Sequence, residues 1–266
     1  MNDDLQLLVC AIDDDIERVG DVLSEPREGI GYVVSLQYTD ERFLRNVPDS
    51  LSEREDVTLS LLPGRGLSRN RNNALEHSRA GILLFADADN HYTAEGLEAV
   101  RESFRTYAWA DIICFSACTY DGEPLKRYPD VALSYAEACR RGYYPSSVEM
   151  AVRQHVTTRF DERFGLGSER FCAGEEAVFL KDAADAGYRI WFVPVCIVST
   201  AAGSTGSRFA QSPQLQQTKG ATFCRLFGPW NALWRSLKEA GHYLIHGGAN
   251  PLGILKNMIK GIWMSR

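Results

Sequence analysis

Apolar residues gather in short runs that alternate with helical patterns along the first two thirds of the chain. Leu5–Ile12 and Gly81–Ala86 are almost continuously apolar, which is typical of strands buried on both faces of a parallel sheet. Further strands are expected over 31–36, 57–62, 111–116 and 188–198, and helices over 14–23, 67–79, 97–107 and 175–186. This alternation predicts an α/β fold with a doubly wound, mostly parallel sheet flanked by helices.

The pattern loosens between residues 121 and 171 and becomes helical near the C-terminus. No linker divides the chain cleanly, so we expect one domain over residues 1–219 with a helical extension over 220–266. In residues 251–266, apolar positions recur at helical spacing beside three positive charges and no acid. A helix lying on anionic lipid, a helix packed on the protein's own core and a dimer contact are all open readings of this segment.

Composition narrows the class of protein. The 266 residues are 45% hydrophobic and 24% charged, which excludes a disordered or fibrous chain. The net charge of −6 disfavours a nucleic-acid partner, which needs a basic surface. Seven cysteines without a CxxC motif favour reduced thiols. With no signal peptide and no apolar stretch of about 20 residues, we expect a cytoplasmic protein with peripheral membrane contact through residues 251–266.

Two carboxylates follow the buried strand at 81–86. Asp87 and Asp89 are two residues apart at the strand end, where burying both charges in the core would be too costly. A turn there can direct both toward one point outside the sheet, and Mg²⁺ or Mn²⁺ commonly bridges one or two carboxylates to phosphates. An ordinary turn built from Asp and Asn is the competing interpretation.

A basic segment, Gly64–Ala74, precedes that strand. It matches neither a P-loop nor a dinucleotide fingerprint, but it offers a turn, a helix N-terminus and three arginines, all of which suit phosphate. Farther along, Glu175 and Glu176 open a predicted helix. Helix-dipole stabilisation explains such a pair on its own, yet a carboxylate in a cleft is also a reasonable general base for a hydroxyl nucleophile.

Taken in order, these segments resemble family 2 glycosyltransferases of the GT-A fold. The resemblance covers roughly residues 5–206 and rests on GLSRNRNNAL, ILLFADADN, FDERFG, GEEAVFL and a strand followed by Ser-Thr-Gly. It implies an inverting, metal-dependent transferase of the hexosyltransferase type. Such an enzyme moves a sugar from a UDP- or GDP-sugar to a glycan or lipid-linked acceptor hydroxyl, in cell-surface polysaccharide or lipopolysaccharide assembly.

The resemblance also assigns roles to individual residues. Asp87 and Asp89 form the DxD motif, with Asp87 near the donor ribose and Asp89 on a Mn²⁺ or Mg²⁺ ion. Glu176 corresponds to the catalytic base, with Glu175 beside it. The remaining donor-binding positions are Ala11, Asp13, Gln37, Asp40, Gly66 and Arg69.

Two departures from the family pattern bear on these roles. Gln37 stands where many members carry an acid, and residues 197–200 lack the histidine metal ligand that many members place after the last strand. The absent histidine motivates one alternative function, a non-catalytic nucleotide-sugar-binding protein. A nucleotidyltransferase acting on a sugar phosphate, which also has an α/β sheet and acidic metal ligands, is the other.

Overall fold

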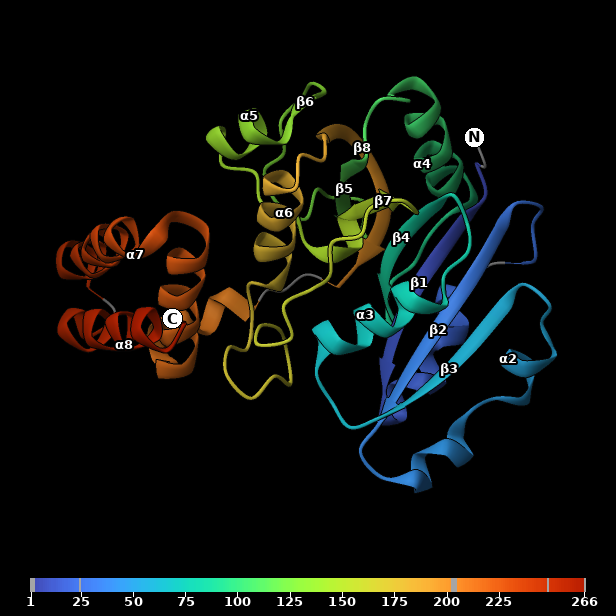
Figure 1. Ribbon diagram of the computed structural model, residues 1–266, viewed down its shortest axis with the longest axis horizontal. Coiled ribbons are helices and arrows are strands. Elements are labelled where there is room, and N and C mark those ends of the chain that lie inside the picture. Colours follow the sequence, from blue (N-terminus) through green and yellow to red (C-terminus); the bar gives the residue numbers. More distant parts are fainter. Residues whose placement is uncertain (1–2, 24, 202–204, 248, 266) are drawn as a thin grey trace. The chain divides into compact units, whose positions relative to one another are not determined.

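The computed structural model describes residues 3–23, 25–201, 205–247 and 249–265, and Figure 1 shows their path. The chain forms two compact units. The first unit comprises residues 1–65, 69–159 and 182–202, and the second comprises 66–68, 160–181 and 203–266. The expected boundary between residues 219 and 220 falls inside a helix of the second unit. Ser204 of the Ser-Thr-Gly motif and Arg266 of the C-terminal segment lie outside the described residues.

An eight-stranded sheet runs through the described part of the first unit in the order β3-β2-β1-β4-β7-β5-β8-β6. Four neighbouring strands, β3 to β4, are parallel, and β5 pairs with β8 in the same sense. Only the short strands β6 and β7 pair antiparallel in the described sheet. The strands are β1 (Leu5–Ile12), β2 (Ile30–Tyr38), β3 (Val57–Pro63), β4 (Ile82–Asp87), β5 (Ile112–Thr119), β6 (Leu133–Ser134), β7 (Met150–Arg153) and β8 (Ile190–Thr200). This confirms the predicted mostly parallel α/β sheet.

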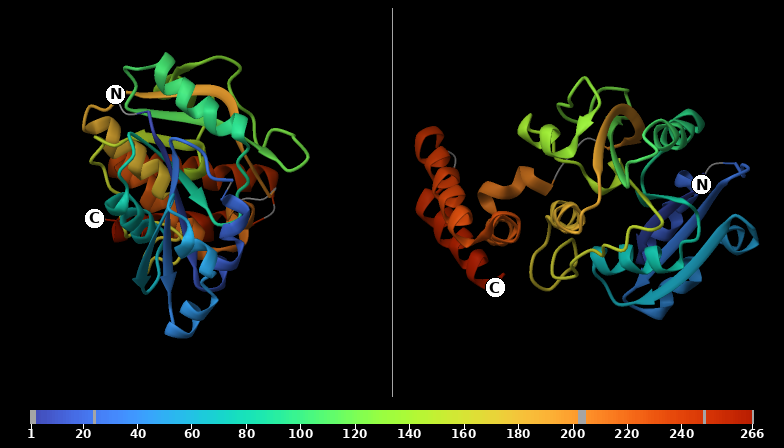
Figure 2. Two further views of the ribbon diagram at one scale, coloured as in Figure 1. Left: turned by 90° about the vertical axis from the view of Figure 1, so that its right-hand side faces the viewer. Right: turned by 45° about the horizontal axis from the view of Figure 1, so that its top comes forward.

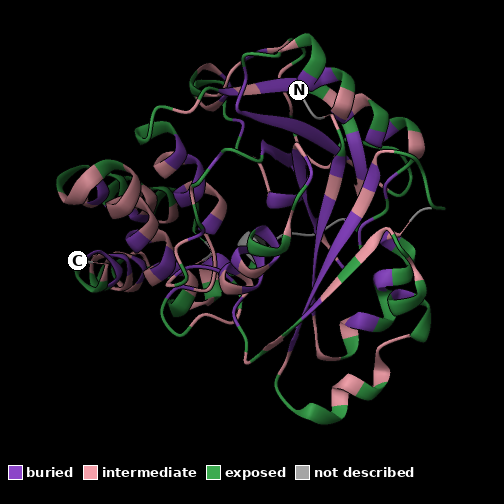
Figure 3. Ribbon diagram, turned by 45° about the vertical axis from the view of Figure 1, so that its right-hand side comes forward, coloured by how far each residue is buried: buried purple, intermediate pink, exposed green. Residues whose placement is uncertain are grey.

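Burial explains why the sequence pattern located the central strands well. Leu7, Val9 and Leu84 are fully buried in one large core that also receives Leu97 and Phe104 from a flanking helix. Figure 3 shows the central strands as largely buried, whereas the edge strand β3 is mostly exposed or partly exposed. The helices are α1 (Val19–Val22), α2 (Asp49–Glu53), α3 (Leu67–His77), α4 (Ala94–Thr106), α5 (Tyr135–Arg140), α6 (Glu175–Asp185), α7 (Pro213–His246) and α8 (Pro251–Met264).

The structure corrects two local predictions. The helix expected over 14–23 is a 3-10 helix, Asp13–Arg18, followed by the single turn α1. Three consecutive aspartates at its start disfavour a regular helix, because Asp competes for backbone hydrogen bonds. The loosely patterned region 121–171 contributes β7 to the sheet between β4 and β5. A four-residue strand is too short to give a period that can be read from sequence.

The expectation that all seven cysteines stay reduced is wrong for one pair. Cys118 and Cys196 are joined by a disulfide, with their Cα atoms 6.3 Å apart. The register between β5 and β8 shifts on both sides of Ser116, which sits opposite Cys196. This irregularity places the two cysteines on neighbouring strands near each other, although 78 positions separate them in sequence.

The described part of the second unit is mainly helical (Figure 2). Helix α7 is interrupted at Gly228, whose φ of 77° is not helical, and Pro229 starts the second half. Helix α8 approaches α7 at two glycines: a Cβ on Gly220 would overlap the backbone of Met258, and one on Gly261 would overlap that of Gln217. Across the described residues, no helix combines the length and apolarity that a membrane span requires.

Candidate active site

The parallel strands β1, β2 and β4 end at one edge of the sheet. Cys10 of β1 lies beside Asp87 of β4, and Ile12 of β1 lies beside Gln37 of β2. The carboxyl ends of these strands therefore bring the turn after β4 and the loops after β1 and β2 to the same edge. In open α/β sheets this edge is where ligands bind.

The turn after β4 fixes the predicted DxD pair. The Asn90 side chain accepts a hydrogen bond from the Asp87 backbone N–H at 2.9 Å, and the Asn90 N–H donates to the Asp87 carbonyl at 3.2 Å. The Tyr120 hydroxyl donates to the Asp89 carbonyl at 2.8 Å. Asp89 is exposed and Asp87 is half-buried, so this closed turn presents the Asp89 carboxylate to solvent.

Arg71 supports the turn from beneath and was not singled out by sequence reasoning. Its guanidinium is almost completely buried, donates to the Ser147 hydroxyl at 2.5 Å and lies 3.4 Å from an Asp87 carboxylate oxygen. Burial raises the pKa of the neighbouring Cys10 thiol to about 12, although Arg71 acts in the opposite direction. Arg71 therefore provides fixed positive charge behind Asp87, and Cys10 stays a neutral thiol.

Asp13 connects the ends of β1 and β2. Its two carboxylate oxygens accept hydrogen bonds from the Thr39 backbone N–H at 2.7 Å and the Thr39 hydroxyl at 2.9 Å. Its φ of 51° is unusual for a residue with a side chain. Asp40 caps the following 3-10 helix by accepting from the Arg42 N–H at 2.9 Å. Both predicted donor-binding acids thus have a defined structural role in the loops at this edge.

Gln37 and Ala11 lie deeper at the same edge. Gln37 is buried, and its amide nitrogen has no hydrogen-bond partner within the described structure. A buried unsatisfied donor is uncommon and indicates a position where a ligand can complete the bonding. The Ala11 carbonyl accepts from the Asn70 side chain at 2.9 Å, so helix α3 is tied directly to the end of β1.

The basic segment divides between the two units. Arg69, in the first unit, donates to the Pro63 carbonyl at 2.8 Å, which holds its guanidinium against the end of β3. Gly66 belongs to the second unit and has a φ of 128°, a backbone conformation that glycine alone adopts readily. Two of the positions predicted to contact the donor are therefore parts of different units.

Asp15 is a further acid at this edge that sequence reasoning missed. Burial raises the pKa of its carboxyl, Arg18 lowers it, and the negative charge of Asp89 raises it again. No group of three or more metal-binding side chains is present among the described residues. The exposed carboxylate of Asp89, with Asp87 beside it, nevertheless fits a divalent cation that takes most of its oxygen ligands from phosphates and water.

The predicted base lies in the second unit, at the start of α6. Glu175 is buried and Glu176 is partly exposed. A Cβ on Gly165 would lie 3.4 Å from the Glu175 carboxyl carbon and 2.9 Å from the Ser68 hydroxyl, and the glycine has a φ of 109°. Glycine at this position thus allows the FDERFG loop to approach the N-terminus of α6 closely.

Signals for the missed residues were weak. Arg71 was one of three arginines in a basic segment, and only its burial separates it from the others. The turn of Asp and Asn that the sequence offered as the competing interpretation is present, and Asn90 closes it. Nothing in the sequence links Tyr120 to the turn after β4, because their contact joins distant segments.

Comparison with known proteins identifies the class. The fold resembles the crystal structure of S. aureus TarS 1-349, with a TM-score of 0.63 at 13% identity over 97% of this chain and 90% of that chain. Its complexes with UDP-GlcNAc and with UDP give TM-scores of 0.61 and 0.61 at 13% and 14% identity, with the same coverage. No curated protein matches the sequence significantly.

This fold, with an acidic strand end at the ligand edge, is that of a glycosyltransferase of the GT-A type. Residues 42–187, more than half of the chain, match the family described as glycosyl transferase family 2. The chain belongs to glycosyl transferase family 2, which confirms the resemblance seen in the sequence.

Proposed function

We propose that this chain transfers a sugar from a UDP-sugar to an acceptor hydroxyl with inversion at the anomeric carbon. The observation that carries this proposal is the exposed Asp89 carboxylate at the carboxyl edge of the sheet, in a chain of glycosyl transferase family 2. The UDP and UDP-GlcNAc complexes of TarS favour UDP over GDP as the donor nucleotide.

In this proposal the first unit binds the donor. The loops after β1 and β2 receive the base, with Ala11, Asp13, Gln37 and Asp40 as the candidate contacts. The unsatisfied amide nitrogen of Gln37 supports this role, since it can donate to a carbonyl of a pyrimidine base. Asp87 accepts from the ribose.

The diphosphate end of the donor needs positive charge. We assign Asp89, with Asp87, to a Mn²⁺ or Mg²⁺ ion, which when bound offsets the charge that develops on the leaving diphosphate. Arg69 and the Gly66 turn are the protein's own candidates for phosphate contact.

We assign the general base to Glu176, because it is the more exposed of the two glutamates at the start of α6. Its carboxylate takes the proton of the acceptor hydroxyl as that oxygen forms a bond to the anomeric carbon. The bond between that carbon and the diphosphate oxygen breaks, and the diphosphate leaves with the electron pair. That Asp89 and Glu176 face one cavity stays a prediction, because they belong to different units.

The acceptor is proposed to be a glycan or lipid-linked glycan of a cell-surface polysaccharide or lipopolysaccharide, handled in the cytoplasm. This assignment rests on the resemblance seen in the sequence. The acceptor needs to supply only one reactive hydroxyl group.

The test measures donor binding and transfer separately. Titration calorimetry with UDP-GlcNAc, other UDP-sugars and GDP-sugars, with and without Mn²⁺, is expected to show binding of a UDP-sugar that Mn²⁺ strengthens. Asp89→Ala should remove the Mn²⁺-dependent part, whereas Glu176→Gln should keep donor binding and lose acceptor-dependent UDP release. Asp130→Ala and Glu169→Gln, two exposed acids of the same units, serve as matched controls.

Four results would contradict the proposal. Absence of binding to every nucleotide sugar rejects it outright, and release of diphosphate from a nucleoside triphosphate with a sugar phosphate indicates a nucleotidyltransferase instead. Unchanged transfer by Glu176→Gln rejects the base assignment. Donor binding without any transfer in the wild-type chain, with an acceptor panel present, indicates a non-catalytic binding protein.

A further inference from the structure

The second half of α7 exposes an apolar stripe. Trp230 is 82% exposed, Trp234 60% and Ile245 78%, and Leu237 and Leu244 are exposed with them. Trp230, Trp234 and Leu237 are four and three residues apart, and Leu244 and Ile245 follow about two helical turns later, so all five lie on one side of the helix. The opposite side is buried through Ala232, Ser236 and Ala240. The helix therefore keeps its small residues inside its own unit and directs its large apolar ones outward.

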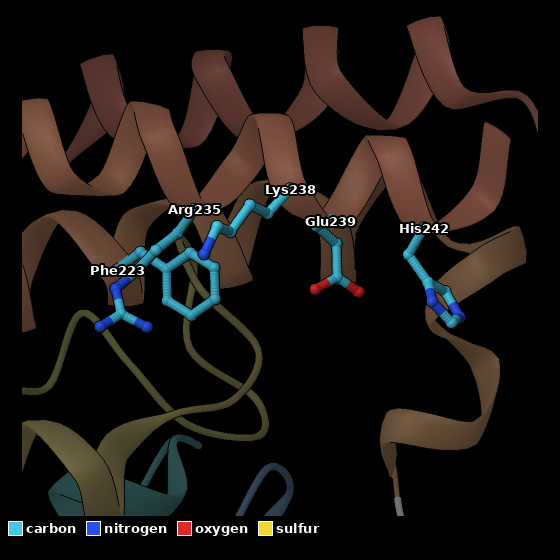
Figure 4. Close-up of a pocket in the computed structure, with 5 residues that line it drawn as sticks. All are labelled: Phe223, Arg235, Lys238, Glu239 and His242. Atoms are coloured by element: carbon cyan, nitrogen blue, oxygen red, sulfur yellow. The ribbon is translucent and has the colours of Figure 1, made fainter. Parts of the chain in front are cut away.

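A basic edge runs along this stripe. Lys238 lies 5.7 Å from the Trp234 ring centroid, and Arg235 lies 3.8 Å from that of Phe227. Figure 4 shows Arg235, Lys238 and His242 beside a cavity of about 300 Å³ that Phe223 and Glu239 also line. Glu239 is already paired with Lys219 at 2.8 Å. The unpaired charge at this edge is therefore positive.

The charge of this segment is opposite to that of the whole chain. Residues 203–266 contain eight Lys and Arg residues and a single acidic residue, Glu239, whereas the chain as a whole carries −6. A surface that combines exposed tryptophan and aliphatic side chains with basic residues fits the boundary between lipid headgroups and acyl chains. The positive charge complements the anionic lipids that such a surface meets.

We propose that the second half of α7, residues 229–246, docks on an anionic lipid bilayer. Trp230, Trp234 and Ile245 enter the interface, and Arg235 and Lys238 bind lipid phosphates from the adjacent cavity. This proposal goes beyond sugar transfer and does not depend on it.

The structure places the exposed apolar and basic surface on α7 and not on residues 251–266, the segment that the sequence pattern suggested. In α8, Ile254, Met258 and Ile262 are buried within the second unit. The exposed residues of α8 are two lysines between apolar residues at its two ends, namely Leu252, Lys256, Lys260, Trp263 and Met264. Packing within the unit thus explains most of the amphipathic pattern of 251–266, and α7 carries the larger unpartnered apolar face.

The experiment uses the full chain and vesicles. Flotation with phosphatidylcholine vesicles is compared with flotation with an equal mixture of phosphatidylcholine and phosphatidylglycerol. The wild-type chain should bind the anionic vesicles, and binding should weaken with salt. The double variant Trp230→Ser/Trp234→Ser should lose binding, and Arg235→Gln/Lys238→Gln should weaken it about tenfold. Trp263→Ser on α8 is the matched control and should bind as the wild-type chain does.

Several results of the vesicle experiment would overturn the proposal. Equal binding to neutral and anionic vesicles, or no binding, rejects the anionic surface, and unchanged binding of the double tryptophan variant rejects α7. Loss of binding in Trp263→Ser shows that the lipid-binding surface lies on α8.

Light scattering provides a further check. If the wild-type chain forms dimers that the double variant abolishes, and neither chain binds vesicles, the stripe is an interface between two copies. Because the substituted side chains are exposed, circular dichroism should show every variant folded.

Discussion

The two units differ in which apolar side chains they bury and in how their buried polar groups are paired. The first unit buries its aliphatic residues in the sheet and pairs several buried polar groups, as Ser35 with Asn70 at 2.5 Å and Arg71 with Ser147 at 2.5 Å. At its ligand edge the Gln37 amide nitrogen is buried without a hydrogen-bond partner in the described structure. The second unit brings its helices together through glycines and leaves tryptophans exposed. The first arrangement suits a site of fixed geometry for a small polar ligand, and the second suits a broad surface.

The largest expected loss of stability follows from removing the disulfide of the first unit. Replacing Cys118 and Cys196 with serine should lower the free energy of unfolding by about 4 kcal/mol, because the disulfide closes a long loop in the unfolded chain. Urea denaturation measures the loss. Thiol titration in denaturant should find five thiols without reductant and seven with it, and seven in both cases would refute the disulfide.

The next prediction concerns the buried charge behind the DxD turn. Arg71→Met should lower the free energy of unfolding by about 3 kcal/mol, because it removes a buried guanidinium that contacts both Asp87 and Ser147. Arg65→Met removes an exposed arginine of the same segment and is the control. Equal urea midpoints for the two variants would show that Arg71 has no structural role.

A third prediction tests the glycine-mediated packing of the second unit. Gly220→Ala should destabilise the protein by about 2 kcal/mol, because its new methyl group overlaps the backbone of Met258. Gly241→Ala, on the same helix, has nothing within 4 Å and should stabilise it by about 0.5 kcal/mol. Thermal unfolding measures both changes, and shifts of the same sign would contradict the close glycine-mediated packing of α7 on α8.

The smallest expected change is in the pH dependence of the free energy of unfolding. Hydrogen bonds from Arg163 hold the pKa of Asp161 below its usual 3.8, so the folded state favours the ionised carboxylate. The resulting stability, about 1 kcal/mol with allowance for solvent screening, is present above the unfolded pKa and is lost as pH falls through the lowered folded value. The difference in unfolding free energy between wild type and Asp161→Asn should therefore shrink below pH 4 in urea titrations. A difference that stays constant as the pH falls would contradict the role of Arg163.

Sequence reasoning predicted the sheet because buried parallel strands leave continuous apolar runs, as in β1 and β4. It placed Asp87 at the end of its strand for the same reason. It did not identify Arg71, since the burial of one arginine among three is set by packing around Ser147. It also could not assign the exposed face of the C-terminal helices, because Ile262 and Trp230 read alike as apolar until their neighbours are known.

The number of residues that follow the break at Gly228 determines which side chains of α7 face outward. Helix α8 meets Gly220 before the break, and Tyr243 after the break packs against a core cluster that contains Ile254 and Met258 of α8 together with Phe209. Each residue turns a helix by about 100°. A single amino acid inserted between Pro229 and Trp230 would therefore move Asn231, Arg235 and Glu239 into the positions where Ala232, Ser236 and Ala240 are now buried. This junction should for that reason tolerate changes in length poorly.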